Sequence, residues 1–302
     1  MQKNREIQAS FGLGLILLAA ILWGTVGIFV QSIYQMTEAN PLSIGFFRLA
    51  LATPVLGLAG WMTIGRQMLQ VERRDVKFLL MIGAMTALYQ VCYFGAIVQI
   101  GVAAATLITL CTAPVWVAVL SVWLLGEKLT QNLVVSGVCA VVGTSCLVGV
   151  QPQMSANSQT HLGLGVLLAT GSAVGYALVT LCSRRVAKRY HPLQCAAIGF
   201  GTGALILLPC AASSEFIIHY PIAGWLCLLY LGIIPTAFAY WLYFIGMRHT
   251  LATTASIATL IEPLTATFLA WSLFHEKLGT LSLIGVGLLL AAIGLLYRDL
   301  RN

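Results

Sequence analysis

Charged side chains are scarce in this chain of 302 residues, at 8% against about 25% in an ordinary soluble domain. Hydrophobic residues make up 59%, and the mean hydropathy is +0.93. A soluble protein of this size needs more polar surface, so the composition indicates an integral membrane protein. The same scarcity excludes a nucleic-acid-binding protein, a secreted disulfide scaffold and a disordered interaction protein. The net charge is +7, but the basic residues are few and scattered and do not form the basic patch of a nucleic-acid-binding surface.

The sequence also lacks paired cysteines and a cleavable leader. No C-x-x-C pair occurs, and every cysteine lies in an apolar stretch, so we interpret them as small packing residues without metal or redox chemistry. We therefore expect no cofactor and no metal. The apolar run 11–30 is too long for a signal-peptide core and has no A-x-A cleavage site. We expect this run to be the first membrane span.

Apolar runs separated by short polar connectors predict an all-α integral membrane protein with ten transmembrane helices. The predicted spans are residues 11–33, 41–64, 78–98, 102–125, 133–150, 162–183, 192–212, 222–246, 251–274 and 280–297. Pro41 and Pro192 each stand at the start of a span, where the missing N–H of proline costs nothing. Ten spans leave no room for a separate soluble domain.

Lysine and arginine are distributed unevenly across these connectors. If the N-terminus is cytoplasmic, 14 of them lie on the cytoplasmic side, Lys277 alone lies outside, and Arg48 lies within a span. Positive residues accumulate on the cytoplasmic side of membrane proteins. We therefore expect a multi-pass protein of the cell (inner) membrane with both termini cytoplasmic and an even number of spans.

The two halves of the chain resemble each other at an offset near 150 residues. The tripeptide E-K-L begins 13 residues after Pro114, at Glu127. It begins again 13 residues after Pro263, at Glu276. Each glutamate ends its span, where capping a helix or pairing with the neighbouring lysine is the expected role. The repeated spacing argues against a chance likeness between apolar segments.

This repeat predicts two units, residues 1–150 (helices 1–5) and residues 151–302 (helices 6–10). Because five spans is an odd number, the second unit must enter the membrane from the opposite side. The expected architecture is therefore a pair of inverted five-helix repeats, with a binding site near mid-membrane at their interface.

Four segments resemble the EamA-type family of the drug/metabolite transporter superfamily. They are A-I-L-W-G (Ala20–Gly24), F-F-R-L-A-L-A (Phe46–Ala52), A-P-V-W-V-A-V-L-S-V-W-L-L-G-E-K-L (Ala113–Leu129) and E-P-L-T-A-T-F-L-A-W-S-L-F-H-E-K-L (Glu262–Leu278). The resemblance covers the whole chain. It implies a ten-helix, two-repeat transporter, often an exporter of amino acids or other metabolites, and it leaves the substrate open.

Two charged residues fall inside predicted spans. Arg48 stands seven positions into the second span, roughly 10 Å below its end at the helical rise. Such a charge should face a cavity or a partner, either as the anchor of a substrate carboxylate or as a structural contact between helices. Glu262 precedes Pro263, where freed carbonyls can line a cavity. It can carry a proton or bind a substrate amine, or it can serve as a structural partner, for example of Arg48.

Polar aromatic residues are the remaining candidates for substrate binding. Tyr89 and Tyr93 share a helix face, with Gln90 beside it. The others occupy the first, sixth and eighth spans: Trp23, Tyr176, Tyr240, Trp241 and Phe244. A cavity lined by these side chains would suit amino acids, aromatic compounds or amphipathic metabolites. Packing in the helix core is the alternative for each of them.

These features favour a secondary-active transporter that exports small organic metabolites by alternating access, driven either by a proton gradient or by the substrate's own gradient. Its partners would be a small-molecule substrate and the lipid bilayer, without nucleic acid. No Walker motif is present, so the sequence offers no site for ATP hydrolysis.

A passive facilitator or channel is the alternative, since it would use the same cavity. An intramembrane enzyme would need paired acids, a histidine-rich cluster or a G-x-S-x-G elbow, and the sequence has none of these.

Overall fold

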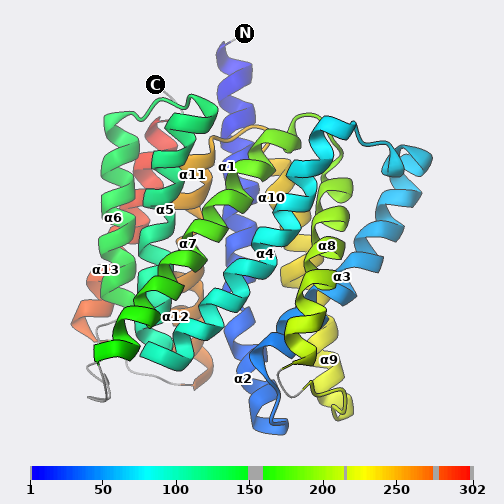
Figure 1. Ribbon diagram of the computed structural model, residues 1–302. Helices are drawn as coiled ribbons and strands as arrows, with labels where there is room; N and C mark the ends of the chain where they lie inside the picture. The colour runs from blue at the N-terminus through cyan, green and yellow to red at the C-terminus, as the bar shows by residue number, and fades with distance from the viewer. Residues whose placement is uncertain (1, 149–158, 214–215, 275–278, 300–302) are drawn as a thin grey trace.

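The computed structural model describes residues 2–148, 159–213, 216–274 and 279–299, and every regular element in these ranges is helical (Figure 1). The elements are α1 (Gln2–Gly24), α2 (Val26–Met36), α3 (Pro41–Ile64), the 3₁₀-helix η1 (Gly65–Leu69), α4 (Arg73–Ile100), α5 (Val102–Leu125), α6 (Gln131–Val148), α7 (Gln159–Ala187), α8 (Pro192–Ala212), α9 (Ile222–Leu231), the π-helix η2 (Gly232–Phe238), α10 (Ala239–Gly246), α11 (Ala252–Ala258), α12 (Ile261–Phe274) and α13 (Thr280–Asp299).

Eight segments within the described ranges are long and apolar enough to cross a membrane. Two of the ten predicted spans differ from this set. The span predicted over 133–150 corresponds to a shorter apolar helix, Gln131–Leu147, and the span predicted over 251–274 is divided into α11 and α12. The chain is thus a multi-pass helical membrane protein, in which eight of the predicted spans have the length and composition of a complete crossing.

The predicted helix starts at proline are confirmed. Pro41 is the first residue of α3, and the side chain of Asn40 accepts a hydrogen bond from the Leu42 amide at 2.8 Å. Pro192 is likewise the first residue of α8. Both positions use the fixed backbone angle of proline where no intrahelical N–H is required.

Helices from the two halves of the chain pack against each other in matching pairs. α4 packs along α7, and α1 packs along α10; α3 packs along α8, and α6 along α13. The last pair meets through glycines, because a Cβ atom on Gly285 would lie 2.6 Å from the carbonyl oxygen of Gly143. Helix backbones can approach this closely only where side chains are absent.

Both chain ends lie at the same end of the bundle, which we call the terminal end (Figure 1). It includes η1 and the connections 188–191 and 247–251, whereas α2 and α9 mark the opposite, distal end. A common end for residues 2 and 299 is what an even number of crossings produces.

The buried apolar core is continuous at the terminal end and divided at the distal end. One large cluster includes Met68, Val186 and Met247, which border the terminal connections. Two separate clusters occupy distal segments. One is centred on Leu228 and includes residues of α2, α3 and α9, and the other is centred on Ala96 and joins α4, α5 and α7. The apolar core therefore consists of one large cluster that reaches the terminal end and two smaller clusters in distal segments.

Candidate functional site

Arg48 is held at an irregular turn of a neighbouring helix. Its Nε donates a hydrogen bond to the Thr236 hydroxyl at 3.3 Å, and this hydroxyl donates in turn to the carbonyl oxygen of Leu231 at 2.7 Å. Thr236 belongs to the π-helix η2, which contains Pro235. Proline supplies no N–H, and π-helical turns occur frequently at functional sites. The arginine thus has a fixed position inside the bundle, and within the described ranges it makes one hydrogen bond to another side chain.

Glu262 stands in the first turn of α12, directly after the chain breaks its helix between α11 and α12. The start of α12 meets the end of α1, since a Cβ atom on Gly24 would lie 2.8 Å from the carbonyl oxygen of Glu262. α1 itself ends at Gly24, before α2 resumes. Glu262 therefore lies where two helix breaks come into contact, and η2 adds a third irregular segment beside Arg48.

The two opposite charges interact at a distance and do not form an ion pair. Arg48 and Glu262 interact electrostatically with each other and with Tyr89. Within the described ranges, the ion pairs closer than 4.0 Å involve other residues, namely Arg74 with Glu72 and Arg189 with Asp75. The site thus contains an unpaired guanidinium and an unpaired carboxyl in the same neighbourhood.

Four of the predicted aromatic residues come together around these charges. Trp23 lies 4.7 Å from Tyr240 between ring centroids, and Tyr89 lies 6.3 Å from Tyr176. Tyr89 and Tyr240 interact with each other and with Arg48, which joins the two pairs. The indole Nε1 of Trp23 is buried and has no hydrogen-bond partner among the residues that the structure describes. A buried donor without a partner is costly unless a ligand supplies the acceptor.

The other predicted residues lie at the margin of this group. The Tyr93 hydroxyl is 2.6 Å from the Thr106 hydroxyl, and Gln90 fills the space beside Gly45 of α3. Trp241 packs against Phe238, which is exposed on the outer surface, and Phe244 is buried against Tyr243. For Phe244 and Trp241 these contacts are those of helix packing.

Several residues of the site were not among the binding residues predicted from the sequence. Thr259 lies 3.0 Å from the Tyr176 hydroxyl, Thr236 contacts Arg48, and the rings of Phe200 and Tyr243 pack against Tyr240 and Trp23. Threonine is common in apolar helices, and its role depends on how each helix is rotated. Only the adjacent Pro235 marked Thr236 as part of an irregular turn.

The terminal end is closed by polar contacts between the two halves. Glu127, which follows α5, accepts hydrogen bonds from the amides of Ala252 and Thr253 at 2.8 and 3.2 Å and from the Thr253 hydroxyl at 3.1 Å. Glu127 thereby caps α11, so the prediction of a capping role is confirmed, although the capped helix lies in the other half. The matching Glu276 lies outside the described residues.

Two arginines join the neighbouring connections at the same end. Arg184 donates to the carbonyl oxygens of Met247 and Arg248 at 2.6 and 3.1 Å. Arg248 donates in return to the carbonyl oxygens of Ala187 and Tyr190 at 2.8 and 2.7 Å. This reciprocal arrangement fixes the start of α11 against the end of α7. Among the described residues, no group of three metal-binding side chains is present.

Comparison with known proteins is consistent with this architecture. The model of the EamA-like transporter family matches residues 10–149 and again residues 163–298. An uncharacterized transporter of Archaeoglobus fulgidus is 28% identical over 96% of this chain and 97% of its own length. The pseudopaline exporter CntI of Pseudomonas aeruginosa is 26% identical over 72% of this chain and 73% of its own length. A solved crystal structure superimposes with a TM-score of 0.79 at 21% identity, covering 96% of this chain and 99% of the other, which shows the same fold.

Proposed function

Because the chain belongs to the EamA-like transporter family, whose named relatives are transporters and not enzymes, we propose that it exports small organic metabolites, amino acids or related compounds, across the cell (inner) membrane. The observation that carries this proposal is that Arg48 and Glu262 carry opposite charges beside Tyr89 and form no ion pair within the described ranges. A compound with both a carboxylate and an amine matches such a pair. The relative named as an exporter supports the direction of transport.

The proposed architecture is ten spans in two inverted five-helix repeats, residues 1–150 and 151–302, with both termini cytoplasmic. It is supported by the helix pairs that join the two halves, by the two matches to one family model, and by the common end of the two termini (Figure 1). In this arrangement the terminal end faces the cytoplasm.

The proposed mechanism is alternating access. The polar contacts of Glu127, Arg184 and Arg248 close the terminal end, and the core is divided at the distal end. This combination supports a conformation from which substrate leaves on the distal side. Breaking those contacts while the two distal groups join would give the opposite conformation, in which the site receives substrate from the cytoplasm.

Each residue of the site has a proposed role. Arg48 binds the substrate carboxylate, and Glu262 carries a proton or holds the amine. Trp23, Tyr89 and Tyr240 line the cavity and contact the apolar part of the substrate. The remaining proposed contacts are Gln90, Tyr93, Tyr176, Trp241 and Phe244, of which Tyr176 lies closest to the helix break through its contact with Thr259.

A growth-protection screen tests the substrate class. Cells that overproduce the protein are challenged with toxic amino acids, their analogues and drugs, and protection is expected against amino-acid-like compounds. Arg48→Ala should abolish protection, whereas Arg66→Ala, which removes an exposed basic residue just beyond α3, should preserve it. Equal protection by both variants would overturn the role of Arg48 as the anchor.

Transport by the purified protein in vesicles tests the coupling and the mechanism. Glu262→Gln should abolish proton-driven uptake, and Glu38→Gln, at an exposed position, should leave it intact. Full pH dependence in Glu262→Gln would show that another group carries the proton. A sustained conductance in electrical recordings would favour a passive facilitator over alternating access.

A further inference from the structure

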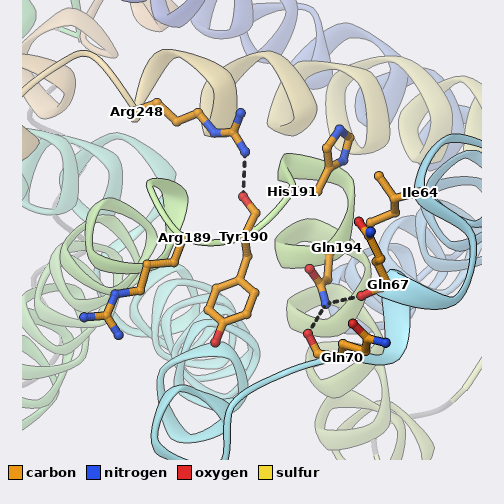
Figure 2. A pocket seen from close by; sticks show the side chains of 8 residues that line it. All are labelled: Ile64, Gln67, Gln70, Arg189, Tyr190, His191, Gln194 and Arg248. Atoms are coloured by element: carbon orange, nitrogen blue, oxygen red, sulfur yellow. Dashed lines mark hydrogen bonds between the residues drawn. The ribbon is translucent and has the colours of Figure 1, made fainter.

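A cavity of about 300 Å³ opens at the terminal end, away from the candidate substrate site (Figure 2). It lies between η1, the start of α8 and the connection after α10. Figure 2 shows Gln67 and Gln70 on one side and Arg248 on the other, with His191 and Gln194 between them. The side-chain Nε2 of Gln194 donates to the backbone carbonyl oxygens of Gln67, Met68 and Gln70 at 3.0 to 3.2 Å. These bonds fix the wall of the cavity that η1 forms.

The surroundings of the cavity carry an excess of positive charge. Residues 65–77, 184–191 and 247–250 contain nine lysines and arginines and only two acids. Both acids are already engaged, because Glu72 pairs with Arg74 and Asp75 pairs with Arg189. Arg248 contacts carbonyl oxygens, and no carboxylate pairs with it in the described part of the chain. Its charge at the cavity therefore has no ionic partner.

The cavity also has groups that lack hydrogen-bond partners. In the described part of the chain, His191 Nδ1 is buried without a hydrogen-bond partner, and the His191 side chain makes no capping bond at the start of α8. Amide groups in the first turn of an uncapped helix favour an anion. Two effects lower the pKa of the His191 imidazole: burial, which is the larger, and the positive charge of Arg248. An anion in the cavity would oppose both effects by giving the imidazole and the guanidinium a common partner.

We propose that this cavity binds a phosphate group, which is either the phosphodiester of an anionic membrane lipid or a free phosphate. The lipid is within reach because Met62 and Leu69, on either side of Ile64 at the cavity edge, are 78% and 77% exposed on the outer surface. Basic pockets between helices on the cytoplasmic side are suited to anionic headgroups. The bound phosphate joins η1, the start of α8 and Arg248, and so stabilises the closed terminal end.

Binding is measured on the full-length protein in detergent micelles, by thermal unfolding and by native mass spectrometry. The micelles contain phosphatidylglycerol, cardiolipin or phosphatidylcholine, and a fourth sample contains inorganic phosphate without lipid. The wild type should be stabilised by a phosphate-bearing anion and not by phosphatidylcholine. Stabilisation by the two anionic lipids alone identifies a lipid headgroup, and stabilisation by inorganic phosphate identifies a free phosphate.

The variant Gln67→Glu/Gln70→Glu adds negative charge to two exposed side chains whose hydrogen bonds to Gln194 use only backbone atoms. Each added charge should weaken binding about fivefold. Gln131→Glu, at an exposed position of the same end, is the matched control and should bind like the wild type. Arg248→Gln provides a second test, because removing this positive charge should weaken binding about fivefold relative to the wild type. Unchanged binding in the double variant, or equal stabilisation by phosphatidylcholine, would overturn the proposal.

Discussion

Removing the carboxylate of Glu127 should loosen the terminal end. α11 begins at Ala252, after Leu251, whose side chain makes no capping bond, and Glu127 supplies the missing acceptor from the other half of the chain. Gly126 makes this possible, because its left-handed backbone (φ 67°) ends α5 and turns the chain at Glu127. Glu127→Ala removes three hydrogen bonds and leaves the amides of Ala252 and Thr253 without their acceptor.

The size of the effect follows from what a helix cap contributes. Losing a helix cap lowers stability by up to about 2 kcal/mol. Because Glu127 is charged and partly buried, we expect a value near the top of this range. If those contacts exist only in the closed state, the open fraction should rise about thirtyfold for 2 kcal/mol. The lost bonds should also lower the melting temperature of the protein in detergent.

Cysteine labelling measures this opening directly. Cys182 is 8% exposed and belongs to the core of the terminal end. In a background where Cys182 is the only cysteine, Glu127→Ala should raise its labelling rate with a hydrophilic maleimide. Glu72→Ala is the matched control, because Glu72 is exposed at the same end and its carboxylate forms an exposed ion pair with Arg74. Equal labelling rates in the two variants would show that the Glu127 cap does not hold the end closed.

Three further predictions concern single groups. Trp23→Phe keeps an aromatic ring but removes the indole Nε1, which has no hydrogen-bond partner among the described residues, so it should raise KM for the transported substrate; Trp61→Phe, at an exposed tryptophan, should leave KM unchanged. Gly285→Ala should destabilise the protein by about 1–3 kcal/mol, because its Cβ would meet the Gly143 carbonyl, whereas Gly287→Ala, with open space around it, should be tolerated in the same thermal assay. Because burial and Arg248 lower the pKa of the His191 imidazole in the folded protein, the unfolded chain binds more protons as the pH falls below about 6.5; the wild type should lose stability through that range, and His191→Gln should lose less, a difference that thermal unfolding across pH would detect.

The positions of the helices could be predicted from hydropathy, but their interruptions could not. The run 11–33 is predominantly apolar and without charge, yet α1 ends at Gly24 and α2 begins at Val26. The run 251–274 likewise conceals the break before α12. Averaging hydropathy over a window detects burial in lipid and not backbone hydrogen bonding, so a break that neighbouring helices satisfy leaves no trace in the hydropathy, and Pro263 indicated freed carbonyls but not where the helix ends.

The charged residues of the candidate site could be found from the sequence for the opposite reason. A charge inside an apolar run is costly, so Arg48 and Glu262 stand out without any knowledge of the fold. Their partners depend on tertiary structure. Thr236 contacts Arg48 across 188 residues, and Glu127 caps a helix 125 residues away. Local spacing predicted a capping role for Glu127 but contained no information about which helix it caps.

The matching prolines of the two halves give a physical basis for the proposed change of conformation. Pro114 lies inside the continuous helix α5, whereas Pro263 lies in the first turn of α12, directly after a break. The same residue at matching positions thus accompanies a continuous helix in one half and a broken helix in the other. In an inverted repeat, exchanging these two conformations between the halves would exchange the open and closed ends. Proline removes one hydrogen bond from either arrangement, so it lowers the difference in free energy between a straight helix and a broken one. Glu262 stands at the break that this exchange would remove, so a change in its protonation or its substrate contact can bias the two conformations.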